Sequence, residues 1–381
     1  PAEAFGEGGP SYGLRITSSP DYWWMEKPDG VWRAPRPALP AIVLTSAGDI
    51  MKLSLRAEGV ATSEPAITME LDNSKGQYAI PGSGALASLR FRSEVVLKLG
   101  YKTTAGSEAV DAGTFWIDSW EYSSTPNQSL FTLHCLDGLG LMDRWTARYQ
   151  MRWNKDAVNP KSVWQILYQL LARVGICLTD TPTKPQSSAI NNFYPDFTIN
   201  PGTPGTQALK KLLTFVPDQL VFRGQEAFTK NPLPAEAPSY SYGVGAADHP
   251  ILSGKYMDAV TASRSRAIGQ DEGANRIVQD ALDWDLLQLG IDVQLQDYDP
   301  NLQTSTSAQE RADALLRDAS LRAERGNLVI PTNVGQELLD VVTVTDARCG
   351  ILTKKYRVLA IRADYDRRKG QYDQTLTLGA P

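Results

Sequence analysis

The sequence predicts a mainly β protein of the α+β class, in which two small β-barrel-like domains of similar topology flank a helix-containing segment. Short stretches rich in β-branched and aromatic residues, separated by turn residues, fill 41–145 and recur in the last third of the chain. Between these regions, apolar residues recur at helical spacing. A chain of 381 residues divides into roughly two to four domains. We place them at 1–40 (extended Pro/Trp-rich arm), 41–150 (first β-barrel-like domain), 151–250 (helical insert and linker) and 251–381 (second β-barrel-like domain with one embedded helix).

The first 40 residues predict an extended arm. Four prolines between positions 28 and 40 exclude a regular helix. Large aromatic side chains gain most free energy by burial, so an arm that carries them is expected to lie against the protein's own body or a neighbouring subunit. The residues predicted to make this partner interface are Tyr22, Trp23, Trp24 and Trp32.

The first β region is predicted to hold six short strands. Turn signals such as Asp72-Asn73 and Pro126-Asn127 separate the apolar or alternating stretches. Regularly spaced short strands of this kind are typical of a small barrel or sandwich. The predicted strands are 41–45, 51–55, 67–71, 95–101, 115–122 and 130–136.

Two helices and a linker are predicted next. The first helix is expected to open at Asn159 and Pro160, because Asn is a good N-cap and Pro suits the first helical position. The second is expected to start at Thr206 and to end before Pro217. Four prolines in 230–250 predict a linker there.

The last third returns to β structure with one embedded helix. Ser307 and Glu310 form a capping-box pattern at the predicted start of this helix, and Gly326 is expected to end it. The strands predicted in this region are 275–280, 328–330, 340–345, 356–365 and 372–378.

The two β regions share one pattern, a strand followed by a long hairpin. The first region reads VVLKLGY and then FWIDSWEYSSTPNQSLFTLHCLDG, and the second reads DVVTVTDA and then YRVLAIRADYDRRKGQYDQTLTLGA. The match favours two β domains of similar topology, and the alternative is a coincidence of common β patterns.

Charge and composition exclude several classes of protein. The 38 Lys and Arg against 43 Asp and Glu give a net charge of −5, spread along the chain, which disfavours tight nucleic-acid binding. The three cysteines are far apart and give neither a disulfide framework nor a CxxC metal site. No stretch is long and apolar enough for a membrane span and the start of the chain lacks a signal-peptide pattern, so a soluble protein is expected.

Enzyme motifs are absent from the sequence. It contains no GxxxxGK[ST], HExxH or GxSxG pattern, and Gly82 and Gly84 are interpreted as a turn. His134 adjoins Cys135, but consecutive side chains of a strand point to opposite faces, so these two are not expected to meet. We therefore predict a protein that is not an enzyme, with no catalytic residues, no cofactor and no metal site.

Carboxylates keep a second hypothesis open. Asp118 and Glu121 lie near Trp116 and Trp120, and two facing acids are all that a glycosidase needs. A carbohydrate-binding or glycan-hydrolysing role therefore remains the alternative. The two acids of the DYDP turn at 297–300 supply too few oxygens for calcium and are interpreted as a solvated turn.

Three C-terminal stretches carry a resemblance to a known family. They read ANRIVQDA at 274–281, TSAQERADALLRDASLRAERG at 306–326, and IPTNVGQELLDVVTVTDARCGILTKKYRVLAIRADYDRRKGQYDQTLTLG at 330–379. Together they resemble the hub proteins of bacteriophage and prophage tail tips, which are related in fold to the central hub of contractile baseplates. The resemblance covers about 274–379, is weaker over 41–145, and does not extend to 1–40 or to much of 180–250.

The resemblance implies a virion structural protein. Hub subunits form a ring, usually a homotrimer, at the distal end of the tail tube, where paired barrel domains imitate the sixfold ring above. The implied partners are further copies of the chain, the distal tail or tail-tube ring, the tape-measure protein, and central spike or fibre proteins. The protein would be made in the host cytoplasm, and DNA would pass through the lumen during genome ejection without specific binding. A third hypothesis, a secreted β-rich adhesion module, fits less well because the cysteines are unpaired.

Overall fold

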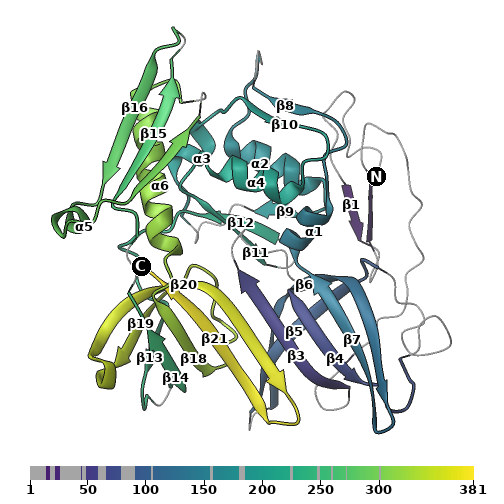
Figure 1. The fold of residues 1–381 in the computed structure, drawn as a ribbon. Coiled ribbons are helices and arrows are strands. Elements are labelled where there is room, and N and C mark those ends of the chain that lie inside the picture. Colours follow the sequence, from purple (N-terminus) through teal and green to yellow (C-terminus); the bar gives the residue numbers. More distant parts are fainter. Residues whose placement is uncertain are drawn as a thin grey trace.

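The α+β class is confirmed by the computed structural model, in which strands outnumber helices (Figure 1). For residues 14–17 and 22–25 the structure describes the backbone only. No helix of the described part is long and apolar enough to cross a membrane. The described residues are 14–17, 22–25, 44, 49–58, 66–78, 91–103, 106–154, 158–179, 185–223, 226–246, 249–258, 261–271, 273–299 and 302–381.

A first β unit forms from antiparallel strands in the order β3-β4-β7-β6-β5. Alternate residues of β4, such as Ile67, Met69 and Leu71, are buried in its core, as the period of two of a half-buried strand requires. The predicted strands from 51 onward are confirmed, with longer bounds. The strands are β3 (Ile50–Glu58), β4 (Ile67–Asp72), β5 (Glu94–Thr103), β6 (Gly106–Thr125) and β7 (Gln128–Leu136).

A second β unit has the order β13-β19-β20-β21-β18-β14. The segment between β13 and β14 brings the two edges of this sheet together. Gly243, at the end of β13, donates to the His249 carbonyl and accepts from the Ile251 N–H. The next residue, Leu252, donates to the Val329 carbonyl of β18 at 2.9 Å. This contact curls the sheet. The strands are β13 (Tyr240–Gly243), β14 (Ser253–Tyr256), β18 (Gly326–Pro331), β19 (Val341–Asp346), β20 (Ile351–Asp366) and β21 (Gln371–Gly379).

Strand β20 joins the two β units into one sheet of 11 strands. Its first part pairs with β19, and its second part pairs with β3 from Ala360 opposite Glu58 to Asp366 opposite Lys52. The shared sequence pattern corresponds to a shared arrangement, because β5-β6-β7 and β19-β20-β21 are both antiparallel meanders with a long middle strand. Figure 1 shows the two units side by side below the helices.

The helical unit has the largest apolar core of the described chain. Helix α2 begins at Val163 and not at Asn159, because Ser162 and Gln165 form the capping box there. Helix α4 begins one residue before the predicted Thr206. The elements are α1 (Gly138–Arg144), β8 (Met151–Trp153), α2 (Val163–Ala172), β9 (Cys177–Thr179), α3 (Ser188–Asn192), β10 (Phe197–Ile199), α4 (Gly205–Leu213), β11 (Gln219–Arg223) and β12 (Glu226–Lys230).

A fourth unit packs a helix on a three-stranded sheet with its own small core. The strand predicted at 275–280 and the embedded helix are confirmed within it, but the sequence pattern predicted neither its other two strands nor a separate unit. The predicted capping box was wrong: Thr304 caps the helix and pairs with Ser307, and the helix ends at Arg322, so that Gly326 opens β18 instead. The elements are β15 (Arg264–Gln270), β16 (Arg276–Leu282), α5 (Trp284–Gln288), β17 (Gln294–Tyr298) and α6 (Ser305–Arg322). The domain boundaries given above stay a prediction.

Two short strands lie in the predicted arm. Strands β1 (Leu14–Thr17) and β2 (Tyr22–Met25) pair antiparallel, so Tyr22, Trp23 and Trp24 belong to a two-stranded hairpin. Trp32 and most of the strand predicted at 41–45 lie outside the described residues.

Asp137 marks the passage from the first β unit to the helical unit. It lies between the end of β7 and the start of α1, and its carboxylate accepts the Gly140 N–H at 2.8 Å as the N-cap of the helix. Burial raises the pKa of this carboxyl, because the charged form loses its hydration. The cap therefore stabilises the start of α1, but burying the charged carboxylate offsets part of this free energy.

We expect Asp137→Asn to be as stable as the native chain or slightly more stable, and Asp137→Ala to lose about 1–2 kcal/mol. The amide oxygen still accepts the Gly140 N–H and carries no charge, whereas Ala leaves that donor unpaired. A raised folded pKa means that the charged carboxyl weakens the native fold as the pH rises, and Asn removes this dependence. Urea unfolding near neutral pH measures the difference. Equal losses in both variants would contradict the capping role.

Candidate functional sites: a buried polar joint and an arginine-lined cavity

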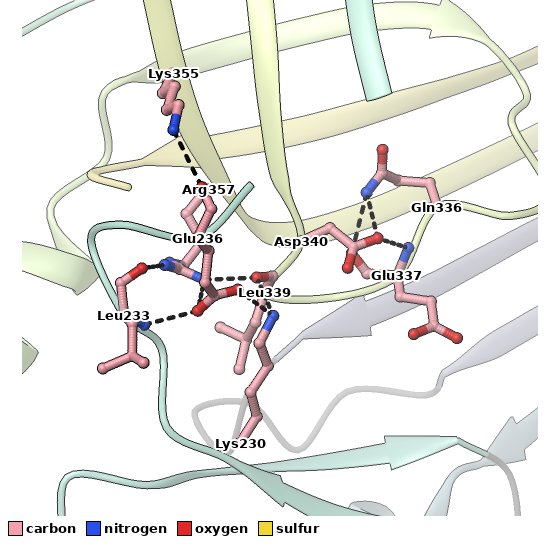
Figure 2. A network of polar contacts seen from close by, with 9 residues as sticks. All are labelled: Lys230, Leu233, Glu236, Gln336, Glu337, Leu339, Asp340, Lys355 and Arg357. Carbon is pink, nitrogen blue, oxygen red and sulfur yellow. Dashed lines mark hydrogen bonds and ion pairs between the residues drawn. The ribbon is translucent and has the colours of Figure 1, made fainter. Parts of the chain in front are cut away.

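The segment 231–239, which was predicted to be part of a linker, is fixed by a network of buried charges (Figure 2). Arg357 of β20 donates to Glu236 at 3.1 Å and to the carbonyls of Leu339 and Leu233 at 2.7 and 2.9 Å. Lys230, at the end of β12, bonds the other oxygen of Glu236 at 2.7 Å and the Leu339 carbonyl at 3.0 Å. The Arg357 side chain has no exposed surface. The network, termed here the polar joint, thus links the helical unit to the second β unit.

Glu236 is the carboxylate on which this joint depends. Burial by itself would raise its pKa, but hydrogen bonds from Lys230 and from the Leu233 N–H, together with the charge of Arg357, hold the pKa below its ordinary value. Two buried cations share this one carboxylate, and both also donate to backbone carbonyls, Lys230 to that of Leu339 and Arg357 to those of Leu339 and Leu233. Loss of Glu236 would leave both cations unpaired in a low-dielectric site.

The Leu339 carbonyl is aimed at the two cations by the backbone around it. Leu339 has a φ of 64°, in the left-handed region that a non-glycine residue rarely adopts. The adjoining loop is held by Asp340, whose carboxylate accepts the Glu337 N–H at 3.0 Å and the Gln336 amide at 3.1 Å. Figure 2 shows this second cluster beside the first. The loop therefore holds the strained backbone conformation of Leu339 that directs its carbonyl toward Lys230 and Arg357.

The fourth unit is tied to the same region through α6. Arg317 donates to Asn231 at 3.2 Å, and Gln219 of β11 donates to Asp318 at 3.1 Å. Burial, and then the charge of Arg357, lowers the pKa of Arg317. Three units therefore meet around the polar joint, which fixes how they are oriented.

A tyrosine cluster makes a second junction, between the two β units. The Tyr101 hydroxyl of β5 donates to the Thr332 carbonyl at 2.6 Å, and the Tyr101 ring lies 5.2 Å from the ring of Tyr372 in β21. Tyr365 of β20 meets Tyr372 edge-on at 6.3 Å. The far end of the first β unit is thereby bound to the second unit independently of β20.

A cavity of about 390 Å³ lies between the first β unit and the helical unit. Its charged lining residues are Arg92, Arg144, Arg148 and Asp118, and Arg144 bonds Asp118 at 2.8 Å. Three guanidinium groups and one carboxylate give the lining a positive excess. The remaining lining is aromatic or apolar and consists of Phe91, Trp116, Ile117, Leu136, Leu141, Trp145 and Val174.

The acids suggested for glycan chemistry do not form a facing pair. Asp118 is bound to Arg144, whereas Glu121 lies 3.9 Å from the His134 ring. Trp116 is buried in the core and Trp120 stacks on the Phe91 ring at 4.4 Å, so neither indole lies open for a sugar. This geometry gives the glycan hypothesis no support.

The other residues considered for catalysis or metal binding are buried or take part in contacts within the fold. Cys135 is fully buried, which raises the pKa of its thiol to about 12, and His134 faces the other side of the strand, as predicted. The interpretation of 297–300 as a solvated turn was wrong for Asp297, which lies in β17 and binds Arg311 of α6 through contacts of 2.7 and 3.0 Å. Among the described residues no group of three or more His, Cys, Asp or Glu could hold a metal ion.

Sequence reasoning missed the polar joint and the cavity. Arg357 and Glu236 are separated by 121 positions in the chain, so no local spacing could pair them. The only signal was a Lys and a Glu within a proline-rich stretch, at positions 230 and 236. The partner interface predicted at Tyr22, Trp23, Trp24 and Trp32 stays a prediction, because the structure describes none of these side chains.

The fold is that of phage and prophage tail proteins. A tail protein from Neisseria meningitidis MC58 superimposes with a TM-score of 0.60 at 14% identity, covering 87% of this chain and 92% of that one. The 43 kDa tail protein of prophage MuSo2 from Shewanella oneidensis gives 0.56 at 13% identity, covering 87% and 94%. Prophage tail protein gp18 from Listeria monocytogenes EGD-e gives 0.50 at 10% identity, covering 85% and 87%. No family model and no curated protein sequence matches the chain.

We expect Glu236→Gln to destabilise the chain by about 3–5 kcal/mol, because two buried cations lose their carboxylate. The depressed folded pKa means that the joint stabilises the native state above the ordinary pKa of 4.5 and that this contribution is lost as the pH falls through the lower folded value. Urea unfolding at neutral and acidic pH measures both effects.

The matched control is Glu310→Gln, which changes an exposed glutamate of α6 in the same way. We expect this variant to lie within about 0.5 kcal/mol of the native chain. If the two variants lost the same stability, or if the acid dependence of Glu236→Gln matched that of the native chain, the polar joint would not have the role assigned to it.

Proposed function

We propose that the chain is a structural, non-enzymatic subunit of a phage-type tail tip or baseplate, a hub that assembles into a trimeric ring continuing or closing the tail tube. The observation that carries this proposal is the fold shared with tail proteins over 87% of the chain. The resemblance of the C-terminal stretches to hub proteins supports it independently.

The geometry of the sheet suits a ring. Two β units of similar meander topology are joined side by side through β20, so three copies would present six similar units around one axis. The tyrosine cluster holds these two β units together and the polar joint holds the helical unit against the second of them, which supports the fixed shape that a ring subunit requires. The partners in this role are the tube ring above, the tape-measure protein, and spike or fibre proteins.

The proposed ring also bears on the passage of DNA. A basic wall would hold a polyanion through many weak phosphate contacts, whereas a neutral or acidic wall lets it pass. The net charge of −5 agrees with a wall of the second kind. In this role the chain surrounds the path of ejected DNA without binding it specifically, and Asp and Glu outnumber Lys and Arg on the residues that face the axis.

We expect the purified chain to self-associate into a trimer at micromolar concentration, because a ring subunit presents apolar surface that only its neighbours cover. Light scattering coupled to size-exclusion chromatography measures the mass. A chain that stays monomeric both alone and with its tube ring would contradict the ring.

We expect Trp23→Ala combined with Trp24→Ala to weaken assembly by a few kcal/mol while the fold remains intact, since indoles in an arm act as interface anchors. Sedimentation measures the assembly and circular dichroism measures the fold. Leu352→Ala, at a residue of β20 that is 71% exposed, serves as the control. Should the double variant unfold, these rings belong to the core of their own chain.

A further inference from the structure

An exposed apolar tip projects from the fourth unit. Helix α5 buries none of its residues, Trp284 is 64% exposed and Leu289 is 75% exposed. Val293 and Leu282 beside them are also exposed. A cluster of this kind marks an interaction surface, and Trp is among the residues most enriched at interface hot spots. We call residues 282–293 the α5 tip.

The α5 tip lies in an acidic part of the chain. Positions 277–310 contain seven Asp or Glu residues and no Lys or Arg. Several of these acids bind arginines of their own unit, as Asp280 binds Arg266 and Asp292 approaches Arg264 at 3.5 Å. Asp285 is exposed in the first turn of α5, directly beside Trp284. The tip therefore offers an indole and a carboxylate together.

The arginine-lined cavity has the complementary chemistry. Arg92, Arg144 and Arg148 outnumber the single carboxylate of Asp118, and the lining between them is apolar and aromatic. Guanidinium groups bind both carboxylates and the faces of indole rings. A volume of about 390 Å³ falls within the range of sites that enclose a small ligand, which is enough for an indole.

The tip and the cavity of one copy cannot meet. In Figure 1, α5 lies at the left edge of the molecule, whereas α1, whose residues line the cavity, lies on the right. We propose that the α5 tip of one copy docks into the arginine-lined cavity of the next copy, with Trp284 inside it and Asp285 against its arginines. A contact between two different surfaces of identical chains runs head to tail, and it closes into a ring when the rotation from one copy to the next is that of the ring. The inference rests on the proposed ring and specifies one of its contacts.

A photoreactive residue at position 284 tests this contact directly. Trp284 is replaced by p-benzoylphenylalanine, which keeps an aromatic side chain, and the assembled chain is irradiated and analysed by mass spectrometry. We expect cross-links between two copies that map to 91–92, 116–118 or 141–148. The same residue placed at Leu352 is the control and should give none at these positions.

The outcomes separate the inference from the proposed function. An assembled ring whose cross-links are absent or map elsewhere overturns the tip contact and leaves the ring standing. A chain that is monomeric alone and with its tube ring overturns both. Cross-links within a single copy at the cavity would also overturn the proposal, because they would show that the tip reaches its own cavity.

A charge exchange gives an independent readout. Asp285→Arg and Arg148→Glu should each weaken self-association roughly tenfold or more, and the two changes in the same chain should recover part of the loss, because the charges then face each other in reverse. Arg368→Glu, at an exposed turn, is the matched control and should leave association unchanged. Losses that simply add in the double variant would overturn the pairing.

Discussion

A strand in the interior of a sheet must pair along both edges, and β20 meets this requirement with three partners. It bonds β21 along one edge, and along the other it bonds first β19 and then β3. The change of partner falls where the register shifts between Val358 and Ala360. From that point Ile361 contributes to one apolar core and Ala363 to the other. The two β units therefore exist as a pair because a single strand serves both.

The polar joint depends on the same strand. Arg357 lies in β20 just before this change of partner, and its guanidinium bonds the segment that leads from β12 to β13. Burying a guanidinium costs free energy unless acceptors pair with it. Glu236 and the carbonyls of Leu233 and Leu339 must therefore lie together around Arg357. The charge thus constrains the orientation of the helical unit relative to the sheet.

These constraints leave particular surfaces open. The polar joint and the tyrosine cluster hold the units together, whereas the cavity beside α1 lies between the first β unit and the helical unit and the tip at α5 projects from the fourth unit. In the proposed ring, the charged inner contacts would keep the shape of each copy while the exposed aromatic tip joins one copy to the next.

Local patterns determined much of the fold. Alternation in β4 and β21 indicates which face of each strand is buried, because a strand repeats every two residues, whereas the β-branched run of β19 is buried on both faces. Helical spacing located α2, α4 and α6, although caps at Ser162 and Thr304 rather than at the predicted residues moved their starts. These features depend on neighbours within a few positions, which is why the sequence alone could predict them.

Contacts between residues far apart in the sequence were decided only by the tertiary structure. The sequence showed two similar β patterns, but only folding showed that β20 pairs with β3, some 300 positions earlier in the chain. Of the separate sheet of β15 to β17 the sequence predicted only the strand at 275–280. Strand β15 was missed because Ser265, Ala267 and Gly269 give little apolar signal, yet their small size lets α6 and Leu302 approach. The polar joint and the cavity are likewise made by residues that have no periodic relation. Their chemistry is visible in the sequence, but their proximity arises only from the packing of the units.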